Sequence, residues 1–273
     1  MSEPEGCNSF VQGFSNVDRD IGTPGSEQRS LRMGPDRRLA AEVDRVVERW
    51  WMLLPELDWY VRLERDIRRF ILGSPTSDLE WRVRWGIYDC VAEALQQGRV
   101  GLGQHGPDRR DRNQPITTVV IHHSGTEPGV SQERLSAMGL LRLYAPVHLD
   151  ARAYPLAYKQ PVYSGHWSGG RQVFYAYHWL VRTTGQVEHL LSDHRVGWHS
   201  GNWDVNTTSI GICLAGDYST SRPNNSMLCS LHDLLARYAP TTVLTHSLVN
   251  PQTSCPGTWV SREDWNQWKC CKG

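Results

Sequence analysis

Two histidines and one cysteine are the residues of this sequence whose types and spacing could do chemistry together. His122 follows the β-branched run of VVIHHSGT (119–126), while His246 and Cys255 lie nine positions apart in HSLVNPQTSCPG (246–257). Two neutral imidazoles and one thiolate form a three-ligand zinc set, which leaves the fourth tetrahedral position for water. Zinc that keeps a water is typical of a catalytic centre, because the metal lowers the pKa of that water.

The elements around these residues could bring them together. The apolar run TTVVI before His122 predicts a buried strand, the run TTVLT before His246 predicts another strand, and Cys255 lies in the loop that follows the second run. Strand ends lie at the rim of a sheet, where functional sites gather. We therefore expect the three side chains to meet at one edge of a sheet, with Pro256 and Gly257 turning the chain so that the cysteine sulfur faces the histidines.

The second half of the chain alternates between strand and helix patterns. Buried strands are predicted over 116–124 and 207–218, an alternating strand over 173–183 and a further strand over 241–247, and helices over 131–144, 225–240 and 260–270. This alternation predicts an α/β fold with a central mixed β-sheet flanked by helices.

The first half has a different organisation. We predict a mobile tail over residues 1–34, a small helical N-terminal region over 35–100, a linker over 101–115 and the catalytic domain over 116–273. The helical region carries a cluster of aromatic residues that could stack on sugars or pack in a core. Tryptophan at helical spacing is more often buried, which favours packing. The cluster comprises Trp50, Trp51, Trp59, Tyr60, Trp81 and Trp85.

Composition excludes several classes of function. The 273 residues carry 29 basic and 29 acidic side chains, so the charge balance offers no attraction for nucleic acid. No apolar stretch is long enough to span a membrane.

We expect a monomer. The N-terminus lacks the pattern of a secretory signal, so we expect a protein that is cytoplasmic as synthesised. It would then either stay in the cell or reach the cell wall by a route that the sequence does not encode. Seven cysteines without a disulfide framework favour a reducing compartment.

Four ordered motifs resemble the zinc-dependent N-acetylmuramoyl-L-alanine amidases, which include the amidase-type phage lysozymes and the peptidoglycan recognition proteins. They are VVIHHSGT, AYHWLVRTTG, GWHSGNWDVNTTSIGICLAGDY and HSLVNPQTSCPG, and the resemblance covers about residues 116–262. It implies cleavage of the amide bond between N-acetylmuramic acid and L-alanine, with peptidoglycan or muropeptides as partners.

The same resemblance implies a role for each matching residue. One Zn²⁺ would be held by His122, His246 and Cys255. Tyr177 and Thr253 would be the catalytic residues, and they are neutral hydroxyl donors that could stabilise an oxyanion. His123 and His199 would line the substrate cleft.

Several alternatives stay open at this point. A non-catalytic peptidoglycan recognition protein is the main one, although such relatives commonly lose the cysteine ligand that this chain keeps. Another zinc hydrolase with a different amide substrate is a third reading. Cys213 occupies the position of a catalytic glutamate in the cytoplasmic recycling amidases, which favours the phage-lysozyme and recognition-protein branch. The insert over 146–172 could shape a substrate groove or be a passive loop, and we expect residues 1–113 to be dispensable for the chemical step.

Overall fold

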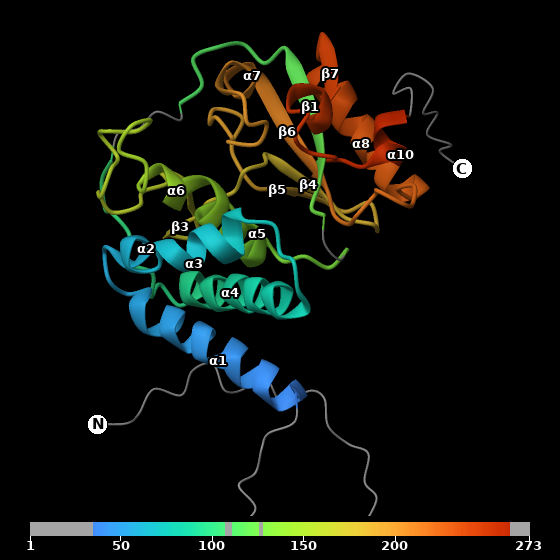
Figure 1. Ribbon diagram of the computed structural model, residues 1–273. Helices are drawn as coiled ribbons and strands as arrows, with labels where there is room; N and C mark the ends of the chain where they lie inside the picture. Colours follow the sequence, from blue (N-terminus) through green and yellow to red (C-terminus); the bar gives the residue numbers. More distant parts are fainter. Residues whose placement is uncertain (1–34, 107–110, 126–127, 263–273) are drawn as a thin grey trace, which may run out of the picture.

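The computed structural model describes residues 35–106, 111–125 and 128–262, and places a five-stranded sheet above a layer of N-terminal helices in the view of Figure 1. The strand order is β5-β4-β6-β1-β7, in which only the β4–β5 pair is antiparallel. This mixed sheet with flanking helices confirms the predicted α/β class. The strands are β1 (Thr118–His123), β4 (Trp179–Val181), β5 (Val187–His189), β6 (Ser209–Leu214) and β7 (Thr242–Thr245), and a separate hairpin pairs β2 (Trp167–Ser168) with β3 (Arg171–Gln172).

Strand β1 lies at the centre of the parallel part of the sheet. It pairs with β6 on one side and β7 on the other, and its register sets His122 beside Cys213. Every residue of β6 is buried, as are the four central residues of β1. Strands covered on both faces read as continuous apolar runs, which is why these segments show no alternation in the sequence.

Helices cover both faces of this sheet. Helix α8 (Asn225–Tyr238) begins where the Asn224 side chain accepts a hydrogen bond from Met227 N–H, and its apolar side chains recur at helical spacing. They pack on β1, β4 and β6 in one hydrophobic cluster, and a second cluster joins helix α5 (Gln132–Gly139) to the other face. The remaining elements of this half are η3 (Leu140–Tyr144), α6 (Ala145–Val147), α7 (Trp203–Thr208), α9 (His246–Val249) and α10 (Thr258–Arg262).

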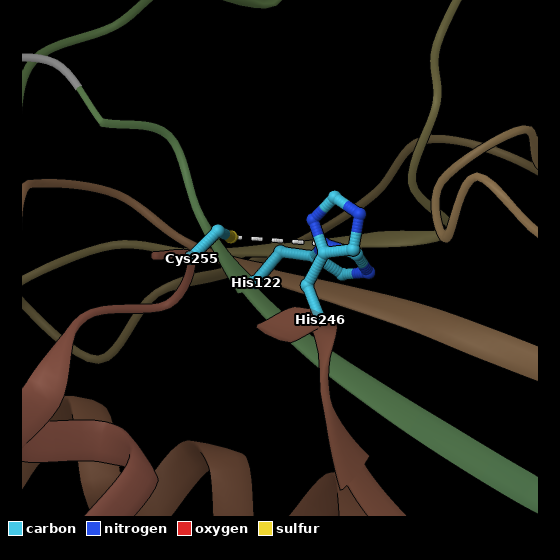
Figure 2. Close-up of side chains that lie close together, drawn as sticks. All are labelled: His122, His246 and Cys255. Carbon is cyan, nitrogen blue, oxygen red and sulfur yellow. Dashed lines mark hydrogen bonds between the residues drawn. The ribbon is translucent and has the colours of Figure 1, made fainter. Parts of the chain in front are cut away.

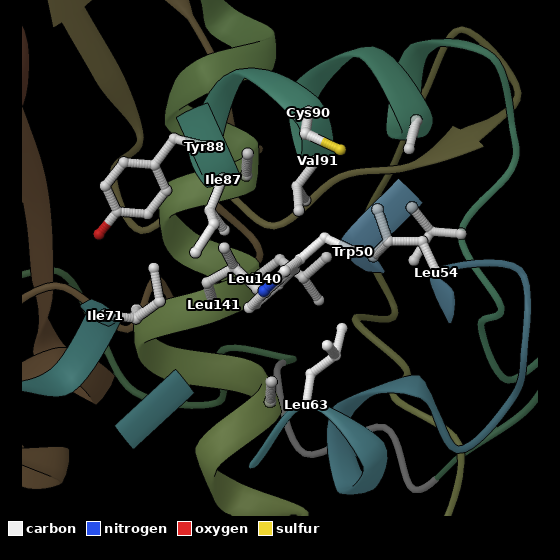
Figure 3. Close-up of a cluster of buried hydrophobic side chains, with 14 of the residues drawn as sticks. Trp50, Leu54, Leu63, Ile71, Ile87, Tyr88, Cys90, Val91, Leu140 and Leu141 are labelled. Atoms are coloured by element: carbon white, nitrogen blue, oxygen red, sulfur yellow. The ribbon is translucent and has the colours of Figure 1, made fainter. Parts of the chain in front are cut away.

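The N-terminal helices share one core with helices α5 and η3. Figure 3 shows Trp50 and Leu63 of this region against Leu140 and Leu141 of η3. Trp50 is fully buried, and its indole N–H donates to Asp66 at 3.0 Å. The helical region is therefore packed against the rest of the chain. Its elements are α1 (Pro35–Leu53), α2 (Trp59–Arg62), α3 (Glu64–Asp66), η2 (Ile67–Leu72) and α4 (Asp78–Gln96).

Most residues of the aromatic cluster pack in the core and do not form an open surface for stacking on sugars. Trp51, Trp59 and Tyr60 are buried with Trp50, whereas Trp81 is 45% exposed. In the described part of the chain, none of the helices has the length and apolar character needed to cross a membrane.

The predicted linker and the 146–172 insert also contact the N-terminal helices. Gly101 N–H donates to the Leu54 carbonyl at 2.7 Å, and Gly103 N–H donates to the Val162 carbonyl at 2.9 Å. The Tyr60 hydroxyl donates to the carbonyl of Gln160 at 2.7 Å. These bonds fix both segments to the helical layer, although neither contributes a strand to the main sheet within the described residues.

Some predicted elements differ from those observed. The strand expected over 173–183 is reduced to β4, because residues before Trp179 make isolated hydrogen bonds instead of a continuous ladder. His246 does not end a strand but begins helix α9, since its carbonyl accepts the N–H of Asn250. The predicted tail over 1–34 and most of the predicted helix over 260–270 lie outside the described residues.

Cysteine pairing also differs from the expectation of free thiols throughout. Cys90, Cys213 and Cys255 are free, but Cys229 on α8 is disulfide-bonded. An odd cysteine count without regular spacing did not predict this bond, because pairing depends on distance in space and not on spacing along the chain.

Candidate metal centre and pocket

Three side chains, two from the ends of parallel strands and one from a loop, meet at one edge of the sheet. His122 is the fifth residue of β1, His246 directly follows β7, and Cys255 lies in the loop after α9 (Figure 2). Their candidate ligand atoms all lie within 4.8 Å of one another. Because β1 and β7 run parallel, their carboxyl ends meet at the same edge, as the sequence predicted.

Cys255 is held toward the histidines by its backbone. Its carbonyl accepts the N–H of Ser247 at 2.8 Å. Gly257, with a φ of +96°, passes so close to Tyr218 that a Cβ would lie 2.3 Å from the Tyr218 carbonyl group. Burial raises the pKa of the Cys255 thiol to about 12, whereas the N–H of His123, 3.3 Å from the sulfur, favours the thiolate.

The two imidazoles are in the neutral form that ligates metals. Burial holds the pKa of His122 well below its usual value, and the nearby His199 and His246 lower it further. Burial also lowers the pKa of His246, while a hydrogen bond to the Ser200 carbonyl opposes this shift. A histidine ligand usually donates its other ring N–H to such a carbonyl, which fixes the ring for the metal.

His122 is positioned by contacts on both sides of its ring. Its Nδ1 lies 3.8 Å from the Cys255 sulfur, and its Nε2 lies 3.0 Å from Nδ1 of His199. The other nitrogen of His199 lies 3.2 Å from the Ser209 hydroxyl. Two neutral nitrogens and one sulfur at these separations suit the tetrahedral coordination of zinc.

The remaining predicted site residues lie around this set. The ring centroid of Tyr177 is 5.0 Å from that of His122. Thr253 Oγ1 accepts the Cys255 N–H at 3.1 Å. His123 Nδ1 accepts the Tyr218 N–H at 3.2 Å, so the ring proton of this neutral imidazole is on Nε2.

A pocket of about 420 Å³ opens beside the three candidate ligands. The structure brings six of the seven predicted residues to its wall, and the seventh, His122, is fully buried against Tyr177 and His199. The predicted residues that line it are His123, Tyr177, His199, His246, Thr253 and Cys255.

The pocket also has walls that the sequence analysis missed. Ile71 and Leu72 of η2 line it, so the N-terminal helical region contributes to the pocket wall, although every candidate ligand and donor lies after residue 116. The sequence placed both residues in the helical region over 35–100, which did not show what that region packs against. None of the described residues of the 146–172 insert lines the pocket, which favours the passive alternative for that segment. Further lining residues are Leu135, Met138, Arg142, Leu143 and Trp198.

Comparison with known proteins places these features in a family. The family model described as N-acetylmuramoyl-L-alanine amidase matches residues 112–258. Peptidoglycan-recognition protein 1 of Holotrichia diomphalia is 27% identical over 124 residues, which cover 45% of this chain and 51% of that protein. The chain thus spans about half the length of this curated relative.

Solved structures of endolysins and of a peptidoglycan recognition protein are also similar to this chain. The endolysin amidase LysCS of Clostridium intestinale URNW is 19% identical and has a TM-score of 0.37, with 57% of this chain and 85% of that one covered. For the Ph2119 endolysin of a Thermus scotoductus bacteriophage, the identity is 18%, the TM-score 0.39 and the coverage 64% and 94%. For Drosophila PGRP-LB the values are 23%, 0.36, 59% and 86%. Since the family model spans more than half of the chain, this protein belongs to the N-acetylmuramoyl-L-alanine amidase family.

Proposed function

We propose that this protein is a zinc-dependent amidase that hydrolyses the amide bond between N-acetylmuramic acid and L-alanine in peptidoglycan. The observation that carries the proposal is the meeting of His122, His246 and Cys255 beside an open pocket, in a member of the amidase family. Three protein ligands and an accessible neighbouring space are the features that separate catalytic from structural zinc.

In this proposal one zinc ion is held by the two histidines and the cysteine. When bound, it supplies Lewis acidity toward water and toward the scissile carbonyl group. Coordination deprotonates a cysteine thiol, which removes the high pKa that burial otherwise imposes on Cys255.

Two hydroxyl groups are suited to stabilise the oxyanion that forms during amide hydrolysis. Burial raises the pKa of Tyr177 well above its usual value, so its hydroxyl keeps its proton at neutral pH. Thr253 uses an oxygen lone pair for the Cys255 N–H, which leaves its hydroxyl proton for the substrate. Preorganised donors of this kind typically contribute 10²–10³ in turnover each, as an order of magnitude.

The two remaining histidines are proposed to line the substrate cleft. His123 carries its ring proton on Nε2 and lies on the pocket wall, which suits a donor to a substrate oxygen. His199 also lines the pocket, but its nitrogens face His122 and Ser209, which supports an additional role in orienting His122.

Incubation of the zinc-loaded protein with purified peptidoglycan, followed by mass analysis of the released fragments, tests this function. We expect stem peptides with a free N-terminal L-alanine and glycan strands that keep the lactyl group. The Cys255→Ala variant serves as the inactive control. Binding of peptidoglycan without any release would instead support a non-catalytic recognition protein, and release at a different bond would indicate another hydrolase.

A further inference from the structure

One side of the pocket carries a single permanent charge. Arg142 lines the pocket from η3, the π-helical segment between α5 and α6. Among the described residues of the pocket wall, none is aspartate or glutamate. The pocket therefore offers a guanidinium group with no anion of its own to neutralise it.

Arg142 also has no partner elsewhere in the parts of the chain that the structure describes: it takes part in no hydrogen bond or ion pair there. Other arginines nearby are paired. Arg182 contacts Glu188 at 2.6 Å, and Arg134 contacts Asp89 at 2.9 Å. A guanidinium has five N–H donors, so an unpaired one beside a pocket is available to a ligand.

The backbone that carries Arg142 is held firmly. Leu140, Leu141 and Tyr144 of η3 are buried in the core shared with the N-terminal helices (Figure 3). Gly139 approaches Phe174 so closely that a Cβ would lie 1.8 Å from its carbonyl oxygen. Because these contacts fix η3, the exposed Arg142 is presented to the pocket from a rigid support.

The surroundings of Arg142 strengthen its attraction for an anion. Leu143 and Met138 of the same segment line the pocket, together with Ile71 and Leu72 of η2. A ligand that covers these apolar side chains would displace water from the exposed guanidinium, and an ionic hydrogen bond shielded from water is stronger than one in bulk water. The charge also opposes the rise in the pKa of Tyr177 that burial causes, which places it within electrostatic reach of the proposed reaction centre.

We propose that Arg142 binds a carboxylate in the peptide part of the substrate and makes the protein prefer acidic over amidated stem peptides. The inference rests on the proposed function only in taking the ligand to be a muropeptide. A planar guanidinium can bind a carboxylate through two parallel N–H···O bonds, whereas a carboxamide offers a single acceptor oxygen and no charge.

A matched pair of ligands tests this role. N-acetylmuramoyl-L-alanyl-D-glutamate and its isoglutamine counterpart differ only in a free carboxylate against a carboxamide. Binding to the metal-free protein is measured by calorimetry, and kcat/KM is measured with the zinc-loaded protein. We expect the acid to bind about tenfold or more tightly than the amide in the wild type.

Variants at Arg142 and at a control position separate the explanations. Arg142→Gln should bring the two affinities within about threefold, and Arg142→Lys should keep part of the preference because lysine is a point charge. Arg65→Gln, which removes an exposed arginine that does not line the pocket, should leave the preference intact. Circular dichroism checks that each variant is folded.

The outcomes distinguish this inference from the proposed function. Equal binding of both ligands by the wild type, or a preference that survives Arg142→Gln, would overturn the role of Arg142 even if both ligands are cleaved. An Arg142-dependent preference in a zinc-loaded protein that cleaves neither ligand would support the inference and contradict the amidase proposal.

Discussion

Replacing Tyr177 with phenylalanine removes one hydroxyl group and keeps the ring that packs against His122. The Tyr177 hydroxyl makes no hydrogen bond to any described residue, and its ring is only partly buried. The substitution therefore breaks no contact that stabilises the fold, and we expect the free energy of unfolding to change by less than about 0.5 kcal/mol. The zinc content should stay the same, since Tyr177 is not part of the ligand set.

The effect on catalysis should be much larger. If the hydroxyl donates to the oxyanion, its loss should lower kcat by about 10²–10³, which corresponds to roughly 2.7–4 kcal/mol of transition-state stabilisation. KM should change little, because the oxyanion exists only during the reaction. The assay is the release of L-alanyl peptide from a soluble muropeptide, with thermal unfolding and metal analysis carried out on the same preparation.

Tyr175→Phe provides a matched control two residues away. Its hydroxyl donates to the Gln132 side chain at 3.3 Å and does not line the pocket. This variant should lose about 1 kcal/mol of stability and keep its turnover. A Tyr177→Phe protein that retains its zinc and works within about threefold of the wild-type rate would refute the donor role and leave Tyr177 as a packing residue.

Three further predictions follow from the ligands, the helical layer and a buried histidine. Cys255→Ala should lose most of its zinc by metal analysis, whereas Cys213→Ala, which removes a buried thiol outside the set, should keep it; full zinc occupancy in the first variant would exclude the assignment. A chain that starts at Arg112 should aggregate in light-scattering measurements, because it exposes Leu140 and Leu141 and removes the η2 wall; a soluble, active monomer would contradict the shared core. His178 accepts the Gly211 N–H on Nδ1 and donates from Nε2 to the Arg195 carbonyl, and burial lowers its pKa to about 4. Its folded state resists a proton that the unfolded state takes up below about pH 6.5, so this contribution to stability should be lost as the pH falls toward 4, by about 2 kcal/mol at pH 5. Urea denaturation of metal-free wild-type and His178→Asn proteins at pH 7 and pH 5 isolates this loss from that of the other buried histidines, and an equal pH dependence in the two proteins would contradict it.

Local patterns in the sequence determined the parts of the site that depend on neighbouring residues. The apolar runs before His122 and His246 predicted two strands, and strands in a parallel pair bring their ends to the same edge. The order of the four motifs indicated the family, and the match over 112–258 confirms it. The roles of Tyr177 and Thr253 remain predictions, although both side chains lie on the pocket wall.

Tertiary structure alone decided how distant segments combine. His122 and Cys255 are 133 positions apart, and only the folded chain shows that their side chains lie within ligand distance of each other. The sequence placed Ile71 in a predicted helical region and Leu141 in a predicted helix, but it could not show that they belong to one core, since a helical pattern does not specify the surface that the helix meets. For the same reason the sequence did not single out Arg142. A surface arginine and an unpaired arginine in a pocket look the same in a linear chain, and they differ only through the neighbours that folding supplies.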